Sequence, residues 1–255
     1  MTTRIHEKID PITNRALILL SIAFFMQATT AMSVVGAFGA IASEWHLSTT
    51  DIAMLVTAFG ATFAVTAPVL QILVGHWIRR TQILFGLSVM ALGALLFAWA
   101  PNYEVLFISR IIAGLGAALI SPVLSALGAS LVKPAQQGGA LATVIMGYSV
   151  ATVIGVPASS WLSLHLGARG FYVVLAAATF FTAALIGFLI KDRTGGGKVS
   201  PAQLKDLMKR PATLSGLLVV FFISSGIFGT YTVITPIFRD LFGASPQMIS
   251  AALLL

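Results

Sequence analysis

The stretch that decides the fold runs from Val105 to Val132 and reads VLFISRIIAGLGAALISPVLSALGASLV. A helix of about 28 residues is long enough to cross the hydrocarbon core of a bilayer. Its one ionisable side chain is Arg110, and a guanidinium in hydrocarbon costs roughly 2.5 kcal/mol or more. Arg110 must therefore either reach the membrane surface along its flexible stem or face a polar cavity inside a helical bundle.

The composition of the whole chain also indicates a membrane protein. Of its 255 residues, 58% are hydrophobic and 9% are charged, whereas about 25% are charged in a soluble domain. We expect an all-α polytopic protein, because a transmembrane β-barrel would show alternating segments of about 10 residues. The net charge of +7 does not indicate nucleic-acid binding, since the basic residues lie in short loops between apolar spans. Cysteine is absent, which excludes a disulfide framework and a cysteine-ligated metal.

Hydropathy and helix breakers predict seven membrane spans and the start of an eighth near Gln247. The predicted ranges are 15–41, 52–74, 83–100, 105–132, 139–162, 171–190 and 212–238. Twelve Lys and Arg residues fall on one side of these spans: Arg4, Lys8, Arg15, Arg79, Arg80, Lys133, Lys191, Arg193, Lys198, Lys205, Lys209 and Arg210. Only Arg169 and Arg239 fall on the other side. The positive-inside rule then predicts a cytoplasmic N-terminus for a multi-pass protein of the inner (plasma) membrane.

The chain is predicted to have three parts. Residues 1–190 form a bundle of six transmembrane helices, residues 191–211 a cytoplasmic linker, and residues 212–255 the incomplete start of a second bundle. Within the linker, TGGG (194–197) predicts a flexible segment, and SPAQLKDLMKR (200–210) predicts a short helix capped by Ser200. This helix suits either the inner membrane surface or a solvated connector.

A weak internal repeat supports the second bundle. Phe24-Phe25 and Phe221-Phe222 recur at an offset that also aligns LST (47–49) with ASP (244–246). Parallel halves of six spans are a transporter architecture, in which a whole protein would continue for about 140 further residues. The alternative to a transporter is a truncated, non-transporting membrane fragment, because the sequence ends inside an unfinished span.

Small residues mark two spans as closely packed. Gly114 and Gly116 follow Arg110 in a run of small residues, which permits close backbone approach. In the fifth span Gly147 and Gly155 lie eight residues apart with a small residue midway, and Pro157 removes a backbone donor and bends the helix. Tight packing alone explains this pattern, and a seam that flexes during alternating access is the functional alternative.

The turn between the second and third spans is short and basic. Gly75 permits the bend, and Arg79 and Arg80 satisfy the positive-inside rule. A role as a cytoplasmic gate would require these cations to meet carboxylates or helix C-termini.

Few polar side chains fall within the predicted spans, and Gln27, Tyr148 and Tyr231 are the candidates for lining a substrate cavity. No predicted span contains Asp, Glu, Lys or His, and all four histidines are expected in loops. We therefore predict no metal site, no catalytic residues and no enzyme activity, and proton coupling lacks an obvious carboxylate.

These residues resemble the major facilitator superfamily, in particular its drug:proton antiporter and sugar-efflux branch. SRIIAGLGAA (109–118) is similar to the family's fourth-helix motif and places its Arg at Arg110. GYSVATVIGVP (147–157) is similar to the fifth-helix antiporter motif, although Val156 separates Gly155 from Pro157. GARGFY (167–172) resembles the sequence that often precedes the sixth helix. The resemblance spans essentially the whole chain.

The basic turn departs from the family's loop motif. Its Asp is missing, and Arg79 and Arg80 match the trailing Arg pair after a deletion. Ser159 and Ser160 replace the terminal glycines of the antiporter motif, as in sugar- and metabolite-efflux relatives. The resemblance implies the major facilitator fold, with one six-helix bundle of two inverted three-helix repeats, helix 7 and the start of helix 8.

The resemblance also implies a function. It indicates a secondary transporter that exports a small organic solute, a sugar, metabolite or drug, by alternating access, with the proton gradient as energy source and no cofactor. Arg110 is then the coupling or substrate-facing charge. The alternative on the same fold is an uncoupled facilitator or importer, and either needs the missing C-terminal half or a second copy to complete the pathway. The substrate and the oligomeric state do not follow from the residues.

Overall fold

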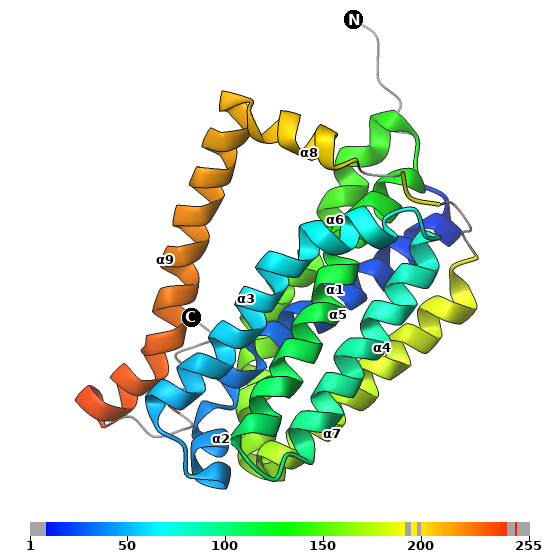
Figure 1. Ribbon diagram of the computed structural model, residues 1–255. Helices are drawn as coiled ribbons and strands as arrows, with labels where there is room; N and C mark the ends of the chain where they lie inside the picture. Colours follow the sequence, from blue (N-terminus) through cyan, green and yellow to red (C-terminus); the bar gives the residue numbers. More distant parts are fainter. Residues whose placement is uncertain (1–8, 192–194, 198–199, 244–247, 249–255) are drawn as a thin grey trace, which may run out of the picture.

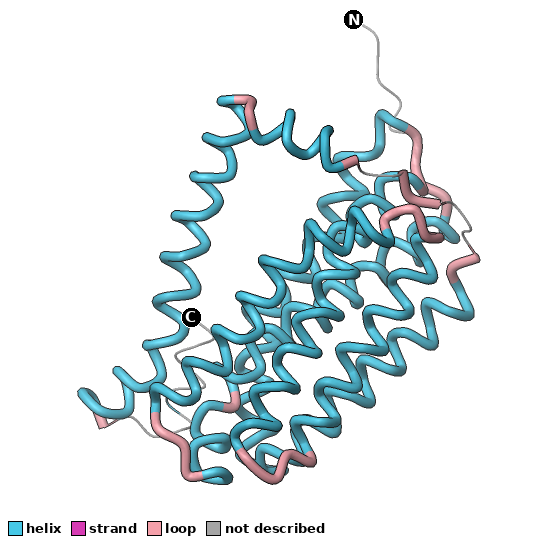
Figure 2. Tube along the Cα trace, in the orientation of Figure 1, coloured by secondary structure: helices cyan, strands magenta, loops and turns pink. Residues whose placement is uncertain are grey.

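The computed structural model describes residues 9–191, 195–197, 200–243 and 248. Helices within residues 11–189 form a bundle, and the long helix of residues 211–242 stands beside it (Figure 1). Figure 2 shows that the rest of the described chain forms loops and turns. The elements are α1 Pro11–Gly36, α2 Phe38–Trp45, α3 Thr49–Val74, α4 Arg79–Ala98, α5 Tyr103–Ser130, η1 Pro134–Gln136, α6 Gln137–Val150, η2 Ala151–Gly155, α7 Val156–Leu189, α8 Pro201–Met208 and α9 Pro211–Phe242. Five continuous helical stretches among the described residues are long and apolar enough to cross a membrane.

Polar side chains at the loops start three of these helices. Asp10 accepts hydrogen bonds from the backbone N–H groups of Ile12 and Thr13 at the start of α1. Ser48 and Asp51 form a reciprocal capping box at the start of α3, and Asn102 accepts from Val105 N at the start of α5. Such caps satisfy backbone donors that the first helical turn leaves unpaired.

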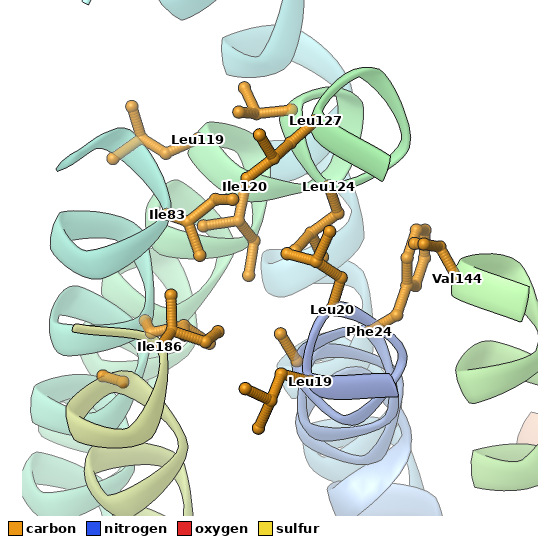
Figure 3. Packing of buried hydrophobic residues seen from close by; sticks show 14 of the residues in the cluster. Leu19, Leu20, Phe24, Ile83, Leu119, Ile120, Leu124, Leu127, Val144 and Ile186 are labelled. Atoms are coloured by element: carbon orange, nitrogen blue, oxygen red, sulfur yellow. The ribbon is translucent and has the colours of Figure 1, made fainter. Parts of the chain in front are cut away.

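The helices pack around two apolar clusters. α4 lies against α5 and α7, α3 lies against α5, and α1 lies against α6 and α7. One cluster, shown in Figure 3, joins side chains of α1, α4, α5, α6 and α7, with Leu20, Ile83 and Ile120 fully buried. The other lies nearer the α2 end of the bundle and includes Leu55 and Phe97. Arg110 is in neither cluster.

Two boundaries differ between the predicted spans and the observed helices. The first span, predicted at 15–41, is divided at Ala37 into α1 and α2. The loop predicted between the fifth and sixth spans is reduced to Gly167, whose φ of 71° lies outside the helical region, so that two helical segments meet there within α7. A glycine adopts this conformation without the steric cost of a Cβ atom.

The helices also extend beyond the predicted spans, which corrects the expectation that no span contains an acidic residue or a histidine. Asp51 and Glu104 lie in the first turns of α3 and α5. His165 lies in α7, and Asp240 lies near the end of α9. Asp51, Glu104 and His165 are at helix starts or beside the break at Gly167, where polar side chains reach water most easily.

A π-helical turn, η2, separates α6 from α7. The N–H of Val156 donates to the carbonyl of Ala151, five residues earlier, and Pro157 has no N–H with which to continue the α-helical pattern. In a regular α-helix, the side-chain directions of two residues that are eight apart differ by about 80° around the helix axis. The one extra residue of a π turn reduces this rotation to about 20°, so Gly147 and Gly155 come onto one face.

The segment after α7 is not simply flexible where it is described. Gly196 donates its N–H to the carbonyl of Trp77 at 3.0 Å, and Gly195 is bridged to Ile78. A Cβ at Gly196 would overlap the carbonyl oxygen of Gly75, so glycine is required for close approach rather than for mobility alone. The predicted helix after Ser200 is confirmed as α8, and Ser200 Oγ accepts from Ala202 N.

Candidate functional site

An apolar cavity of about 650 Å³ opens between four helices of the bundle. Its volume lies within the range of about 300–1,000 Å³ found for small-molecule sites. Phe24 and Tyr148 flank it with their rings edge to face, 6.0 Å apart between centroids. The lining residues are Phe24 of α1; Phe63, Ala67, Pro68 and Gln71 of α3; Ser121, Pro122 and Ser125 of α5; and Ile145 and Tyr148 of α6.

The polar groups of this cavity are few and uncharged. They are the amide of Gln71 and the hydroxyls of Ser121, Ser125 and Tyr148, and no Asp, Glu, Lys or Arg is among its described lining residues. Gln71 Nε2 donates to the carbonyl of Leu119 at 3.5 Å, the outer limit of a hydrogen bond. The cavity can therefore hold a largely apolar molecule and orient it through a small number of hydrogen bonds.

Arg110 lies apart from this cavity, buried between α1, α3 and α5. Only 1% of the residue is exposed, which excludes the alternative that its guanidinium reaches the membrane surface. Nε donates to Leu55 O at 3.3 Å, Nη1 to Thr30 O at 3.0 Å and Nη2 to Ala31 O at 3.0 Å. The guanidinium also lies 4.6 Å from the centre of the Phe59 ring.

This environment corrects the expectation that Arg110 faces a polar cavity. The gap beside it has no volume for a water molecule, and its described partners are all neutral. Hydrogen bonds to a charged group contribute about 1.5–3 kcal/mol each. Three carbonyl bonds can thus offset a desolvation cost of several kcal/mol. Arg110 connects three helices, and a role in proton coupling remains a prediction.

A hydroxyl pair extends the arginine network to α7. Ser33 Oγ lies 3.4 Å from Arg110 Nη1 and 2.9 Å from Tyr172 Oη. Ser33 Oγ also lies 2.8 Å from Thr30 O, so that its hydroxyl links the backbone of α1 and the arginine network to Tyr172. The Tyr172 ring stacks on Phe97 of α4 at 3.8 Å. Five helices are therefore tied together around one cation.

The predicted small residues lie where helices approach most closely. A Cβ at Gly147 would overlap the carbonyl oxygen of Ser21, and one at Gly155 would lie 2.5 Å from Thr29 Oγ1, both on α1. At Gly114 a Cβ would lie 2.9 Å from Phe59 O of α3, and at Gly116 2.6 Å from Gly86 O of α4. Gly147 and Gly155 thus pack inside this bundle, while their proposed role as a flexing seam with Pro157 stays a prediction.

The basic turn between α3 and α4 has two different arginines. Arg80 donates from Nη2 to the carbonyl of Gly187, one of the last four of α7, where a cation is favourable because the helix dipole is negative. Arg79 instead lines a second, smaller cavity together with Gly75. Their predicted role as a gate is untested, but the predicted meeting with a helix C-terminus occurs at Arg80.

The other two candidate cavity residues have different positions. Gln27 is 5% exposed inside the bundle, and its Oε1 has no hydrogen-bond partner among the described residues. Tyr231 lies in α9, and its side chain is outside the described residues. Sequence reasoning missed Gln71, although an amide near the end of an apolar span, three residues after Pro68, was a usable signal.

An ion pair connects helices at the end of the bundle opposite to the α3–α4 turn. Arg169 Nε donates to Glu44 Oε1 at 2.7 Å, and its two other nitrogens donate to Ala98 O and Ala100 O. The guanidinium lies 4.9 Å from the centre of the Trp45 ring. This arrangement joins the ends of α2 and α4 to the segment that follows Gly167.

Comparisons with known proteins agree with this architecture. The chain is 32% identical over 244 residues to the inner membrane transport protein YdhP of Escherichia coli (strain K12), covering 95% of this chain and 62% of that protein. It is 27% identical over 231 residues to a chloramphenicol efflux pump of Mycobacterium tuberculosis (strain H37Rv), covering 88% and 55%. The chain therefore spans about 55–62% of the length of these relatives.

A solved structure shows the same fold. A bacterial homologue of the human lysosomal transporter Spinster, inward-facing and unoccupied, matches with a TM-score of 0.77 at 15% identity, covering 97% of this chain and 59% of that one. The family model for the Major Facilitator Superfamily matches residues 20–255. The bundle, its apolar cavity and these matches together establish that the chain belongs to the Major Facilitator Superfamily of membrane transporters.

Proposed function

We propose that this chain supplies the substrate-binding bundle of an inner-membrane exporter for small, uncharged organic molecules with aromatic or other apolar surface. The observation that carries the proposal is the apolar cavity of about 650 Å³ between α1, α3, α5 and α6. Its aromatic and proline side chains favour apolar surface, and its amide and hydroxyl groups favour a solute with a few hydrogen-bonding groups.

The uncharged lining argues against a charged solute. A charge moved from water into an apolar site needs a partner charge or several hydrogen bonds. Among the described lining residues, the polar groups are the amide of Gln71 and three hydroxyls. A relative with chloramphenicol efflux in its name supports a drug or metabolite of this kind as the substrate.

The pathway is proposed to need a second bundle. Four helices surround the apolar cavity, and alternating access works by rocking one bundle against another around a shared site. A C-terminal half or a second copy would supply the facing wall. The basic residues at the α3–α4 turn and around α8 support a cytoplasmic position for that end, with the N-terminus on the same side.

Export is proposed to be driven by proton exchange. The resemblance of the fourth- and fifth-helix motifs to antiporters supports coupling, and Arg110 would contribute by fixing α1, α3 and α5 relative to one another. An uncoupled facilitator is the second candidate, because the cavity lining includes no carboxylate among the described residues.

Chloramphenicol binding to the purified chain tests the cavity. Tyr148→Phe removes one hydroxyl from the lining, and we expect Kd to rise about fivefold, the equivalent of one neutral hydrogen bond. Tyr103→Phe is the matched control, because its hydroxyl donates to Asp51 O at 3.3 Å at the start of α5, outside the cavity. Equal effects of the two substitutions would contradict the assignment.

A transport measurement then separates the two mechanisms. Cells that express the chain with a complete second bundle are loaded with labelled chloramphenicol, and its efflux is followed before and after an uncoupler is added. Proton-coupled export predicts that efflux against a gradient stops when the uncoupler is added. Efflux that continues at the same rate would identify an uncoupled facilitator.

A further inference from the structure

The second cavity, about 270 Å³ in volume, has a polar wall that the transport pathway does not explain. The wall consists of Gln71, Gly75, Arg79, Gln82, Gly196 and Gly197. They come from α3, the α3–α4 turn, α4 and the segment after α7, so the cavity is assembled by parts of the chain more than 100 residues apart. Here we call it the basic cavity.

One side of the basic cavity favours an anion. Arg79 is the first residue of α4, and Ile78 before it offers no side-chain oxygen to cap the helix. The N-terminus of a helix carries a partial positive charge, and its N–H groups bind phosphate oxygens. A guanidinium at the same point adds a full charge and planar donors.

The glycine segment closes the cavity and presents backbone to it. Gly196 is held by its hydrogen bond to Trp77 O at 3.0 Å, and Gly197 has open space around the position of a Cβ. Because neither residue has a side chain, a ligand can approach the main chain directly. The hydrogen bond to Trp77 O thus positions the backbone of Gly196 in this wall.

Gln82 limits which hydrogen-bonding groups suit a ligand of the basic cavity. The residue is 1% exposed, and its Nε2 donates to Leu119 O at 3.0 Å. Its Oε1 has no hydrogen-bond partner among the described residues, and an unpaired buried acceptor costs about 1–3 kcal/mol. A ligand with a hydroxyl donor beside its anionic group would satisfy this acceptor.

We propose that the basic cavity binds a phosphate ester that carries a hydroxyl group, namely the headgroup of an anionic glycerol phospholipid. Arg79 and the start of α4 hold the phosphate, and Gln82 Oε1 accepts from a glycerol hydroxyl. A lipid is favoured over a soluble ester because the glycine segment leads into α8, whose exposed Lys205 and the following Lys209 suit a membrane surface. The basic cavity shares Gln71 and Pro122 with the apolar cavity, so the headgroup would lie beside the substrate.

Lipid binding to the purified chain in detergent, measured by native mass spectrometry, tests the proposal. Phosphatidylglycerol should bind about tenfold more tightly than phosphatidylcholine, and Arg79→Gln should remove most of this preference, as expected for one charge-assisted bond. Arg15→Gln is the matched control, since it removes an exposed arginine of α1 that does not line the cavity. Equal losses in the two variants would overturn the proposal in favour of general surface charge.

The hydroxyl is tested with a second lipid. Phosphatidylmethanol has the same phosphate charge without the glycerol hydroxyls, and it should bind several-fold more weakly than phosphatidylglycerol to the wild-type chain. Gln82→Met should make the two lipids equal, and an unchanged difference would overturn the assignment of Gln82.

Two further arms complete the experiment. If Arg79→Gln fails to fold, Gly197→Val replaces it, because its side chain enters open space and should obstruct the headgroup. Glycerol 1-phosphate is added as competitor to the wild-type chain. No displacement at millimolar concentration supports the lipid, and displacement at micromolar concentration would overturn it in favour of a soluble phosphate ester.

Discussion

The contact between Gly155 and Thr29 allows the π-helical seam to be tested by substitution and rescue. In Gly155→Ala, the added Cβ would lie 2.5 Å from Thr29 Oγ1, whereas ordinary Cβ contacts begin at 3.4 Å. Overpacking of this kind costs about 1–3 kcal/mol, while Ala in place of Gly returns up to about 1 kcal/mol of helix propensity. We expect the free energy of unfolding to fall by about 1 kcal/mol, which corresponds to a fall in Tm of about 2–4 °C.

Rescue follows from the identity of the nearest atom. Thr29→Ala removes Oγ1, which has no hydrogen-bond partner among the described residues, and leaves Thr29 Cβ at 3.4 Å. The free energy of unfolding of the double variant should therefore be about 2 kcal/mol higher than that of Gly155→Ala. This difference corresponds to about 4–8 °C in Tm. Tryptophan fluorescence in detergent follows unfolding through the chain's 4 tryptophans.

Two control substitutions test whether the loss of stability depends on the atom that the added Cβ meets. Gly139→Ala lies in α6, and its Cβ would have nothing within 4 Å, so it should not lower Tm. Gly147→Ala meets the backbone carbonyl of Ser21, so Ser21→Ala should not rescue it. Strictly additive effects of Gly155→Ala and Thr29→Ala would refute the packing of this seam.

The remaining predictions concern the two arginine networks. Arg110→Lys should be less stable than Arg110→Met by about 2 kcal/mol, because an ammonium stays charged but cannot reach three carbonyl oxygens at once; equal Tm values would contradict this. Arg110→Glu should not accumulate as folded protein, since an anion would face Thr30 O, Ala31 O and Leu55 O, and size-exclusion chromatography measures this. At the other end, Glu44→Ala should cost less than about 1 kcal/mol because the pair is solvent-exposed. Arg169→Ala should cost about 2 kcal/mol more, since it also loses bonds to Ala98 O and Ala100 O, and a comparison of the two Tm values decides.

Local chemistry made several helices predictable from the sequence. The ranges 52–74 and 105–132 lie close to α3 and α5, because a continuous apolar run between polar turns marks each of them. The small residues after Arg110 and around Gly155 also indicated close helix packing, which their contacts confirm. These features depend on neighbours within a few residues or on the absence of a side chain.

The surroundings of Arg110 were not predictable in the same way. Its acceptors lie 55 and 80 residues away in sequence and are backbone carbonyls, which every residue has. Neither a carboxylate nor a water-filled cavity accompanies Arg110, so the acceptors have no signature of their own in the sequence. The π turn was not predictable for a related reason. Pro157 indicates a bend, but it does not indicate whether the turn before it is α-helical or contains the one additional residue of a π turn.

The cavity could be predicted only in part. Tyr148 was identified as the large polar side chain of an apolar span, and it lies in the lining. Gln27 has the same sequence signal but is buried inside the bundle. The difference depends on which side of each helix faces a neighbour, which one sequence alone does not give.

The order of Arg110 and its acceptors along the chain has a consequence for biogenesis. Thr30, Ala31 and Leu55 all precede Arg110, and nascent chains emerge from the ribosome N-terminus first. When α5 reaches the translocon, the carbonyls that solvate its guanidinium have already been synthesised, so α5 has partners at the moment of insertion. A circular permutant that began at α4 would deliver Arg110 to the lipid before α1 and α3 existed.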